Sequence, residues 1–441
     1  MATIDATIRR VERVRFGAAK MDYVLLLTVI VLLIMGLMMV YSTTFDWSFA
    51  LTRNPLSLLM RQTMWVAMGL VAMAVLSRID YLWWQRLAIP IMIAAVVLLL
   101  LVLGFGSVRF GAQRTFLNGS VQPSEPAKLS IIIYIAAWLS SKGKRVRQMT
   151  YGMVPFAVLI GFIAGLIVLQ PDFSTAILIV LTAGAMFFIS GADLLQVAIG
   201  LVVSSGTFYL LIINSPHGAQ RLNHYLATLK DPEAVSYHVQ QALVALGSGG
   251  LFGRGLGAGY QKFGYLPAPH TDSVFAVLGE ELGLAGCVVV IGLFAMLAQR
   301  GFKIALEARD PFGAVLAVGL TCWLIFQAVI NIAVMTAMVP FTGLPLPFLS
   351  MGGSSMLSSL AAVGLLLSVS RGSRAAVMSK AQPPPVTASS HLRDAALSRA
   401  QPSGLGHSTH WDKTHRGGRK RASSVFWWRN RRTRVSRISR R

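Results

Sequence analysis

The chain has 441 residues, of which 54% are hydrophobic and only 13% are charged, a composition that excludes an ordinary soluble domain and predicts an all-α polytopic membrane protein. The net charge is +23 at pH 7, but the segment after residue 370 has 17 Lys and Arg against two Asp and so carries +15 of it. A basic tail beside a membrane segment is typical of contact with anionic lipid, so the high pI does not indicate nucleic-acid binding.

The first 20 residues are polar and basic, which argues against a cleavable signal peptide. Apolar runs then predict about ten transmembrane helices, most of them near the length that a helix needs to cross a bilayer. The predicted spans are 22–43, 61–78, 84–104, 126–141, 152–170, 174–191, 194–214, 273–298, 312–338 and 355–370. We therefore expect a basic N-terminal tail over 1–20, a transmembrane domain over 21–372 and a disordered basic tail over 373–441.

The distribution of Lys and Arg orients these spans. The N-terminal tail, the connections after the fourth and eighth spans, and the C-terminal tail are all basic. With ten spans the four segments lie on one side, and the positive-inside rule makes that side cytoplasmic, so both termini are cytoplasmic. The longest connection, 215–272, then lies outside the cell between the seventh and eighth spans. Its apolar residues at helical spacing predict short interfacial helices, followed by a Gly-rich turn over 247–259.

Two short motifs place an acid beside a proline at the outer end of a span. Gln-Pro-Ser-Glu covers 122–125 and opens the fourth span, and Gln-Pro-Asp covers 170–172 after the fifth. Glu125 and Lys128 are three residues apart on a predicted helix, so their side chains can pair. Helix capping alone would explain Glu125 and Asp172, whereas a third acid near the outer loop favours a shared outward-facing cavity.

The stretch 266–283 leads from a polar, proline-broken loop into the eighth span. Asp272 at its mouth favours two compatible interpretations, an N-cap that accepts a backbone N–H and a general base at the outer membrane surface. His270 and Thr271 beside it are candidates to orient the acid or to bind a substrate hydroxyl.

Two further acids, Glu280 and Glu281, fall deeper in the same apolar segment. A carboxylate at that depth needs a partner or a water-filled cavity. Ala276, Gly279, Gly283 and Gly286 fall on the same side of the predicted helix as Asp272. Such small residues predict that another helix packs closely there.

Cationic residues in the outer loop offer a site for an anion. The candidates to hold a phosphate or pyrophosphate are Arg221, Lys230, Arg254 and Lys262, and contact with lipid headgroups is the equal alternative for each of them. The Gly-rich turn lacks the G-x-x-x-x-G-K-[ST] pattern of a phosphate-binding loop. Its glycines favour tight backbone turns instead.

Another candidate region follows the ninth span, which contains Asn331. The segment 340–355 has three prolines and two adjacent glycines and carries no charge, so it cannot form a long helix. An apolar, non-helical segment at this place predicts a re-entrant stretch lining a cavity, with a plain loop as the alternative. Ser354 and Ser355 at its end are candidate cavity residues.

These motifs resemble the SEDS family (shape, elongation, division and sporulation) over about residues 20–372. The form of residues 265–283 is more similar to the division branch of the family than to the elongation branch. The resemblance rests on QPSEPAK (122–128), LQPDFSTA (169–176), GSGGLFGRGLG (247–257), YLPAPHTDSVFAVLGEELG (265–283) and PFTGLPLPFLSMGGSS (340–355).

The resemblance implies a ten-span peptidoglycan glycosyltransferase of the bacterial cytoplasmic membrane. Such proteins polymerise lipid II into glycan strands on the outer face of the membrane, together with a class B penicillin-binding protein that crosslinks the strands. The essential outer-loop aspartate of the family corresponds to Asp272. The resemblance also implies functional positions at Glu125, Lys128, Asp172 and Arg114. It implies no certain cofactor, and a divalent cation, Mg²⁺ or Mn²⁺, is left open as a source of positive charge.

Two other functions are compatible with the same residues. A lipid II flippase would also use intramembrane acids and broken helices. Its pathway needs polar residues at both interfaces, whereas the candidates here cluster at the outer one. A scaffold that only recruits the crosslinking enzyme, alongside other membrane proteins of the division septum, would leave Asp272 dispensable.

Overall fold

The computed structural model describes residues 21–105, 107–109, 112–115, 122–230 and 236–381. The basic N-terminal tail over 1–20 lies outside this range, and so do residues 382–441 of the tail predicted to be disordered. The start of that tail, 373–381, is helical and continues the last helix of the structure.

Every predicted span coincides with a helix. These helices are α2 (Tyr23–Thr52), α3 (Ser57–Arg78), α4 (Leu82–Phe105), α5 (Ser124–Lys142), α6 (Val154–Val168), α7 (Phe173–Ile189), α8 (Leu194–Ile213), α11 (Val274–Leu306), α12 (Pro311–Met335) and α13 (Gly353–Ala381). Eight stretches of helix in the described residues are long and apolar enough to cross a membrane, and α7 is a shorter apolar helix. The fold is therefore that of a multi-pass helical membrane protein, and the count of ten spans stays a prediction.

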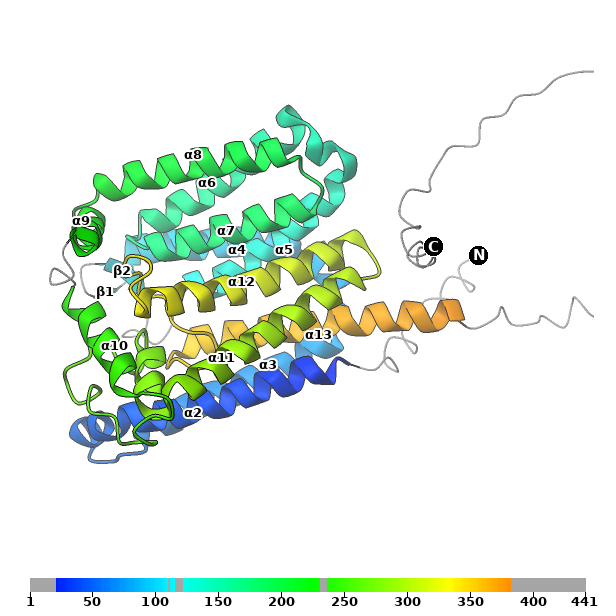
Figure 1. The fold of residues 1–441 in the computed structure, drawn as a ribbon. Coiled ribbons are helices and arrows are strands. Elements are labelled where there is room, and N and C mark those ends of the chain that lie inside the picture. Colours follow the sequence, from blue (N-terminus) through cyan, green and yellow to red (C-terminus); the bar gives the residue numbers. More distant parts are fainter. Residues whose placement is uncertain (1–20, 106, 110–111, 116–121, 231–235, 382–441) are drawn as a thin grey trace, which may run out of the picture. The chain divides into compact units, whose positions relative to one another are not determined.

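Helix α12 lies at the centre of the bundle. It packs against α5, α7, α11 and α13, and most of its residues are buried. The start of α2, the end of α13, and the α5–α6 and α11–α12 connections lie at one end of the bundle, on the right in Figure 1. This grouping agrees with the topology predicted from charge. The connection between α5 and α6 contains a 3-10 turn, η2 (Gly143–Arg147), and a π-helical turn, η3 (Met149–Met153).

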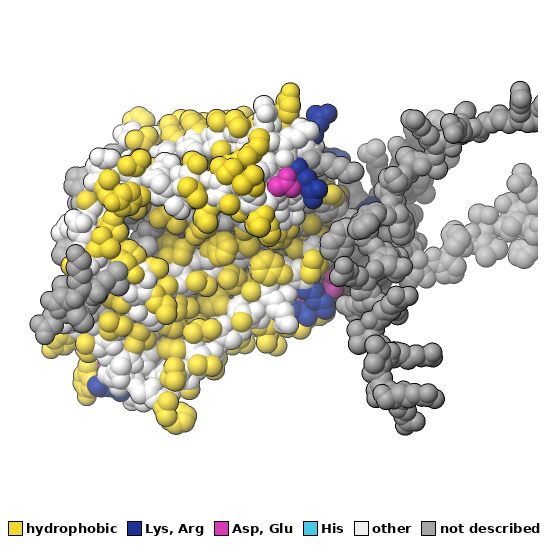
Figure 2. Space-filling view, turned by 45° about the horizontal axis from the view of Figure 1, so that its top comes forward, with side chains coloured by type: hydrophobic (Ala, Val, Ile, Leu, Met, Phe, Trp, Pro, Cys, Tyr) yellow, Lys and Arg dark blue, Asp and Glu magenta, His cyan; other side chains and the backbone are white. Residues whose placement is uncertain are grey.

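Hydrophobic side chains cover much of the outer face of the bundle (Figure 2). Helix α8 is the extreme case, because Gln196 is its one buried residue and Leu194 and Val202 are more than 70% exposed. In water such a surface would be an aggregation hazard, whereas lipid tails solvate it. The exposed apolar surface thus agrees with the composition in indicating a membrane protein.

The opposite end of the bundle holds the short elements. They are the hairpin of β1 (Ser107–Arg109) and β2 (Ala112–Thr115), α9 (Pro216–Lys230) and α10 (Tyr237–Ser248). The helices α9 and α10 confirm the short helices predicted for the 215–272 connection, whose position outside the cell stays a prediction. The hairpin is a small departure from an all-α chain.

The segment 338–352 is non-helical, as its prolines predict, and its middle is deeply buried. Leu344, Leu346 and Leu349 are at most 3% exposed. A Cβ atom on Gly36, near the middle of α2, would lie 2.2 Å from the carbonyl oxygen of Phe348. The glycine on α2 therefore lets this segment, which we call the re-entrant segment, reach into the bundle between the helices.

Helix α11 is broken at Gly283, where the backbone has φ 66° and ψ −166°. The Gly-rich turn docks at this break. The N–H groups of Arg254 and Gly255 donate to the carbonyls of Glu280 and Glu281, and the N–H groups of Leu284 and Ala285 donate to the carbonyls of Gly250 and Leu251. The glycines thus do more than allow tight turns, because they bring this backbone close enough to replace the hydrogen bonds that the break removes.

We expect Gly283→Ala to lower the thermal stability of the detergent-purified protein. The alanine would adopt a positive φ, and its Cβ would lie 2.3 Å from the backbone nitrogen of Gly253. Strain of this kind costs about 1–3 kcal/mol. Gly292→Ala on the same helix is the control, because a Cβ there meets nothing within 4 Å. Equal melting temperatures for the two variants would contradict the importance of the break.

Candidate active site

Asp272 lies in a tight turn just before α11, and three hydrogen bonds from α12 and the re-entrant segment hold this turn. The side chain of Asn331 on α12 donates to the carbonyl of Asp272 at 2.8 Å. Ser350 of the re-entrant segment donates to the carbonyl of Thr271 at 2.5 Å, and the N–H of Met351 donates to the carbonyl of His270 at 2.8 Å. The turn therefore has a fixed backbone, although it belongs to no helix.

The carboxylate of Asp272 accepts no hydrogen bond from the residues that the structure describes. Burial raises its pKa to about 6, and the nearby positive charge of Arg221 on α9 acts in the opposite direction. The N-cap interpretation of Asp272 is wrong, because Ser273 occupies the cap position of α11 and neither side chain caps the helix. The three-way tethering of the turn decides its conformation, and it leaves the acid available for chemistry.

His270 and Thr271 flank the acid but do not bond to it. The imidazole of His270 packs against the indole of Trp47 on α2, with ring centroids 4.5 Å apart, and burial lowers its pKa to about 4. The hydroxyl of Thr271 reaches the carbonyl of Ala268 at 3.5 Å. Both residues thus shape the turn, and His270 is neutral at neutral pH.

The predicted pair of Glu125 and Lys128 is confirmed. Their side chains are 3% and 1% exposed, and the ammonium lies 2.9 Å from the carboxylate. The ammonium also donates to the side-chain oxygen of Gln327 at 3.0 Å and lies over the ring of Trp323. Gln327 in turn donates to the carbonyl of Pro345 at 2.9 Å, so the pair is linked to the re-entrant segment.

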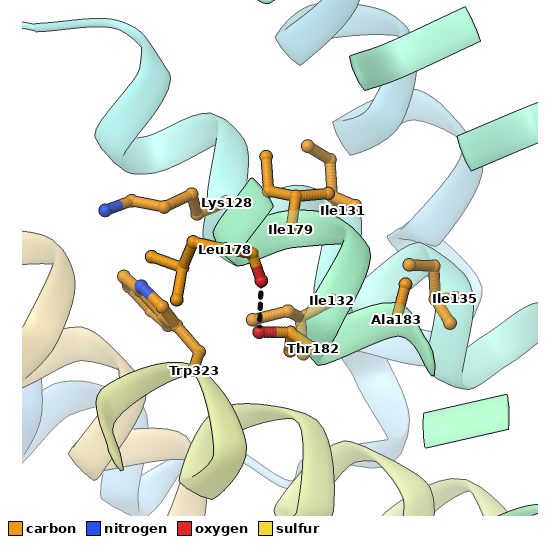
Figure 3. Close-up of a pocket in the computed structure, with 9 residues that line it drawn as sticks. All are labelled: Lys128, Ile131, Ile132, Ile135, Leu178, Ile179, Thr182, Ala183 and Trp323. Atoms are coloured by element: carbon orange, nitrogen blue, oxygen red, sulfur yellow. Dashed lines mark hydrogen bonds between the residues drawn. The ribbon is translucent and has the colours of Figure 1, made fainter. Parts of the chain in front are cut away.

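A small cavity adjoins this pair between α5, α7 and α12 (Figure 3). Its walls are apolar apart from Lys128 and Thr182, and the hydroxyl of Thr182 donates to the carbonyl of Leu178. The space suffices for about one water molecule. It is a packing gap and is too small for a sugar.

Asp172 caps α7, as one of the two interpretations predicts. Its carboxylate accepts from the backbone N–H of Thr175 at 3.2 Å and from the hydroxyl of Thr175 at 2.9 Å. The side-chain amide of Gln122 also reaches it, at 3.4 Å, and the backbone N–H of Gln122 donates to Ser354 at 3.2 Å. The two proline motifs and the start of α13 therefore meet, with Ser355 half-buried beside them.

Lys262 and Glu281 form a second buried ion pair, with 2.7 Å between nitrogen and oxygen and side chains 4% and 0% exposed. Ser42 on α2 donates to the same carboxylate oxygen. Glu280 accepts from the backbone N–H of Tyr260 at 2.8 Å. Both deep acids thus have partners, as their depth requires, and Lys262 is engaged inside the protein. Arg254 is exposed, and its guanidinium lies over the ring of Tyr260.

The remaining predicted candidates are Arg114 and a divalent cation. Arg114 belongs to β2, and its side chain is not among the described residues. No group of three His, Cys, Asp or Glu side chains within the described ranges is arranged to hold a metal ion.

One residue close to Asp272 was not predicted from the sequence. His238 on α10 lies with its ring nitrogen 2.7 Å from the hydroxyl of Ser273, and its ring packs against Phe341 of the re-entrant segment. A single histidine in a long loop gives no signal in one sequence, because only the fold brings it to position 273.

Comparison with known proteins identifies the family of the chain. A family model for FtsW, RodA and SpoVE, described as cell cycle protein, matches residues 23–375. The chain belongs to this family. The family predicted from the motifs is thereby confirmed.

Individual relatives match along nearly their whole length. The chain is 39% identical to a probable peptidoglycan glycosyltransferase FtsW of Trichlorobacter lovleyi over 81% of this chain and 95% of the relative. It is 41% identical to the stage V sporulation protein E of Bacillus subtilis over 80% and 98%.

Two solved structures have the same fold. One is described as the structural coordination of polymerization and crosslinking by a peptidoglycan synthase complex, with 28% identity, coverage of 80% and 98%, and a TM-score of 0.64. The other is the rod shape determining protein RodA of Thermus thermophilus, with 28% identity, the same coverage and a TM-score of 0.58.

We expect Lys128→Ala to be more damaging than Glu125→Ala. Without the lysine, the buried carboxylate loses its one described partner, whereas without the acid the ammonium keeps Gln327. An unpaired buried charge costs about 3–5 kcal/mol, so folded yield and activity both fall. The double replacement should be no worse than Lys128→Ala alone, because it removes both charges.

A double-mutant cycle on melting temperature and activity measures this coupling. Glu307→Ala is the control, since its pair with Lys303 is 3.9 Å long and about half-exposed, and such pairs contribute about 0–1 kcal/mol. Simple addition of the two losses at 125 and 128 would show that the residues act separately.

Proposed function

We propose that this protein is a peptidoglycan glycosyltransferase that polymerises lipid II at the outer face of the cytoplasmic membrane, during septal wall synthesis in cell division. The names of its relatives support the reaction class. The observation that carries the proposal is the Asp272 carboxylate, which is desolvated and held on a rigid turn without a described hydrogen-bond partner. A general base needs a fixed position and a pKa near the working pH, and Asp272 meets both requirements.

In this reaction the 4-hydroxyl of the acceptor GlcNAc attacks C1 of the MurNAc at the end of the growing strand. Asp272 takes the hydroxyl proton as the new C1–O bond forms. The bond between C1 and the pyrophosphate breaks, undecaprenyl pyrophosphate leaves, and the configuration at C1 inverts. The rigid turn holds the carboxylate in place, which lowers the entropic cost of reaching the transition state.

The leaving pyrophosphate carries negative charge, which positive groups near the base would stabilise. Arg221 lies close enough to Asp272 to influence its pKa, and it stands over the ring of Phe341. We therefore assign the leaving-group side to Arg221, together with Arg114 from the hairpin. The described His, Cys, Asp and Glu side chains around Asp272 do not form a group that could hold a metal ion, so we derive no step through a cation.

The nascent strand must then be crosslinked, and our proposal assigns this second reaction to another enzyme. We propose a class B penicillin-binding protein as the partner, within an assembly of other division proteins at the septum, with both termini in the cytoplasm. A solved relative described as part of a peptidoglycan synthase complex supports such a pairing.

Asp272→Asn should abolish polymerisation of lipid II by the purified protein with its partner. The amide is isosteric and cannot accept the proton. Since a buried charge is removed, the melting temperature should not fall. Gel analysis of glycan strands measures the product. Wild-type turnover in this variant would exclude the general-base role and would favour a scaffold, for which Asp272 is dispensable.

The pH dependence gives an independent test. A base must be ionised, and burial raises the pKa of Asp272 from 3.8 to about 6. The activity should therefore decline as the pH falls through about 6, two units earlier than for an ordinary aspartate. Arg221→Gln removes a charge that lowers this pKa, so the acidic limb of kcat/KM should move to higher pH. An acidic limb near pH 4 in the wild type would contradict the burial of the base.

A further inference from the structure

We propose that His238 is a positioning residue for Asp272, acting through the hydroxyl of Ser273 next to the base. This inference rests on the proposed function, because the positioned group is the general base. His238 comes from α10, and Ser273 follows Asp272 directly in the chain. The contact therefore joins two parts of the fold that are 35 residues apart in sequence.

The direction of the hydrogen bonds follows from their partners. The hydroxyl of Ser273 donates to the carbonyl of Pro267 at 2.9 Å, and a carbonyl can only accept. Ser273 has a single hydroxyl proton, so at 2.7 Å from the same oxygen the Nε2 atom of His238 is the donor. The result is a chain of two hydrogen bonds from His238 through Ser273 to Pro267, which closes the turn from 267 to 273.

Ser273 makes these two hydrogen bonds instead of capping α11 with its side chain. Ser273 is the N-cap residue of α11, and its side chain forms no cap hydrogen bond. Serine at this position ordinarily accepts from a backbone N–H two or three residues later. Its hydroxyl instead serves the turn, and it is fully buried, so water cannot substitute for either partner.

The ring of His238 has a second fixed contact. It packs against Phe341 at a centroid distance of 4.2 Å, and Arg221 stands over the same phenyl ring at 5.6 Å. The segment beginning at Phe341 passes over the base, since a Cβ on Gly343 would lie 3.4 Å from the Asp272 carboxylate. His238 therefore connects α10, the turn that carries the base, and the chain that covers it.

The donor role can be separated from packing by paired substitutions. His238→Leu keeps bulk against Phe341 and removes the donor, whereas His238→Gln keeps an N–H donor. We expect His238→Leu to lower kcat about 10- to 100-fold, with little change in KM, because misplacement of a catalytic group slows the chemical step. His238→Gln should recover most of the loss. Gln240→Ala, an exposed site on the same helix, is the control and should match the wild type.

A cycle with Ser273→Ala tests whether the two residues act together. If they act through one bond, the double variant His238→Leu, Ser273→Ala should be no slower than the slower single variant. The proposal would be overturned if the fold-losses in kcat of the two single variants multiplied in the double variant. It would also be overturned if His238→Leu kept kcat within twofold of the wild type. A His238→Gln variant as slow as His238→Leu would overturn it too.

Asp272→Asn assayed in the same series keeps the two hypotheses apart. Activity in Asp272→Asn would remove the general-base role of Asp272, on which the positioning role depends. An inactive Asp272→Asn enzyme beside a fully active His238→Leu enzyme would remove the positioning role alone. All variants are compared as the full chain with its partner, at equal folded yield by size-exclusion chromatography.

Discussion

The requirement that buried backbone polar groups be hydrogen-bonded governs the functional end of this protein. Within an apolar bundle there is no water to satisfy them, so irregular backbone survives only where other protein groups bond to it. The break at Gly283 is satisfied by the Gly-rich turn, and the turn that carries Asp272 is satisfied by Asn331 and Ser350. The same bonds that permit non-helical backbone here also immobilise it, which is how a site outside any helix acquires a fixed geometry.

The second constraint is on charge. Glu125 and Glu281 each face a buried lysine, and Glu280 and Asp172 accept from backbone N–H groups. Of the five acids in this region, Asp272 alone has no described donor to its carboxylate. A neutralised acid holds helices and loops together, whereas an acid that is desolvated and unpaired has a raised pKa and can take up a proton. The fold thus separates four acids that have described partners from Asp272, which is the base in the proposed function.

The sequence predicts much of this arrangement, but only where the signal is local. Apolar runs placed the helices, prolines placed the re-entrant segment, and i,i+3 spacing placed the pair of Glu125 and Lys128. Contacts between distant segments could not be predicted, such as Lys262 with Glu281 or His238 with Ser273. The capping interpretation of Asp272 was wrong for the same reason, because bonds from α12 and the re-entrant segment outweigh the local preference. A glycine at 283 is equally compatible with close helix packing, so the break had no separate signal.

The raised pKa of Asp272 and its accessibility to substrate make opposite demands on the structure. Desolvation requires that protein cover the carboxylate, and the backbone at Gly343 lies directly beside it. Accessibility requires that the cover leave room for a hydroxyl group. Gly343 meets both demands, because it lies against the carboxylate with a positive φ and has no side chain to fill the space beside the oxygen. The backbone of the re-entrant segment thus excludes bulk water. In the proposed reaction, the missing Cβ would leave space beside the carboxylate oxygen for an acceptor hydroxyl to approach.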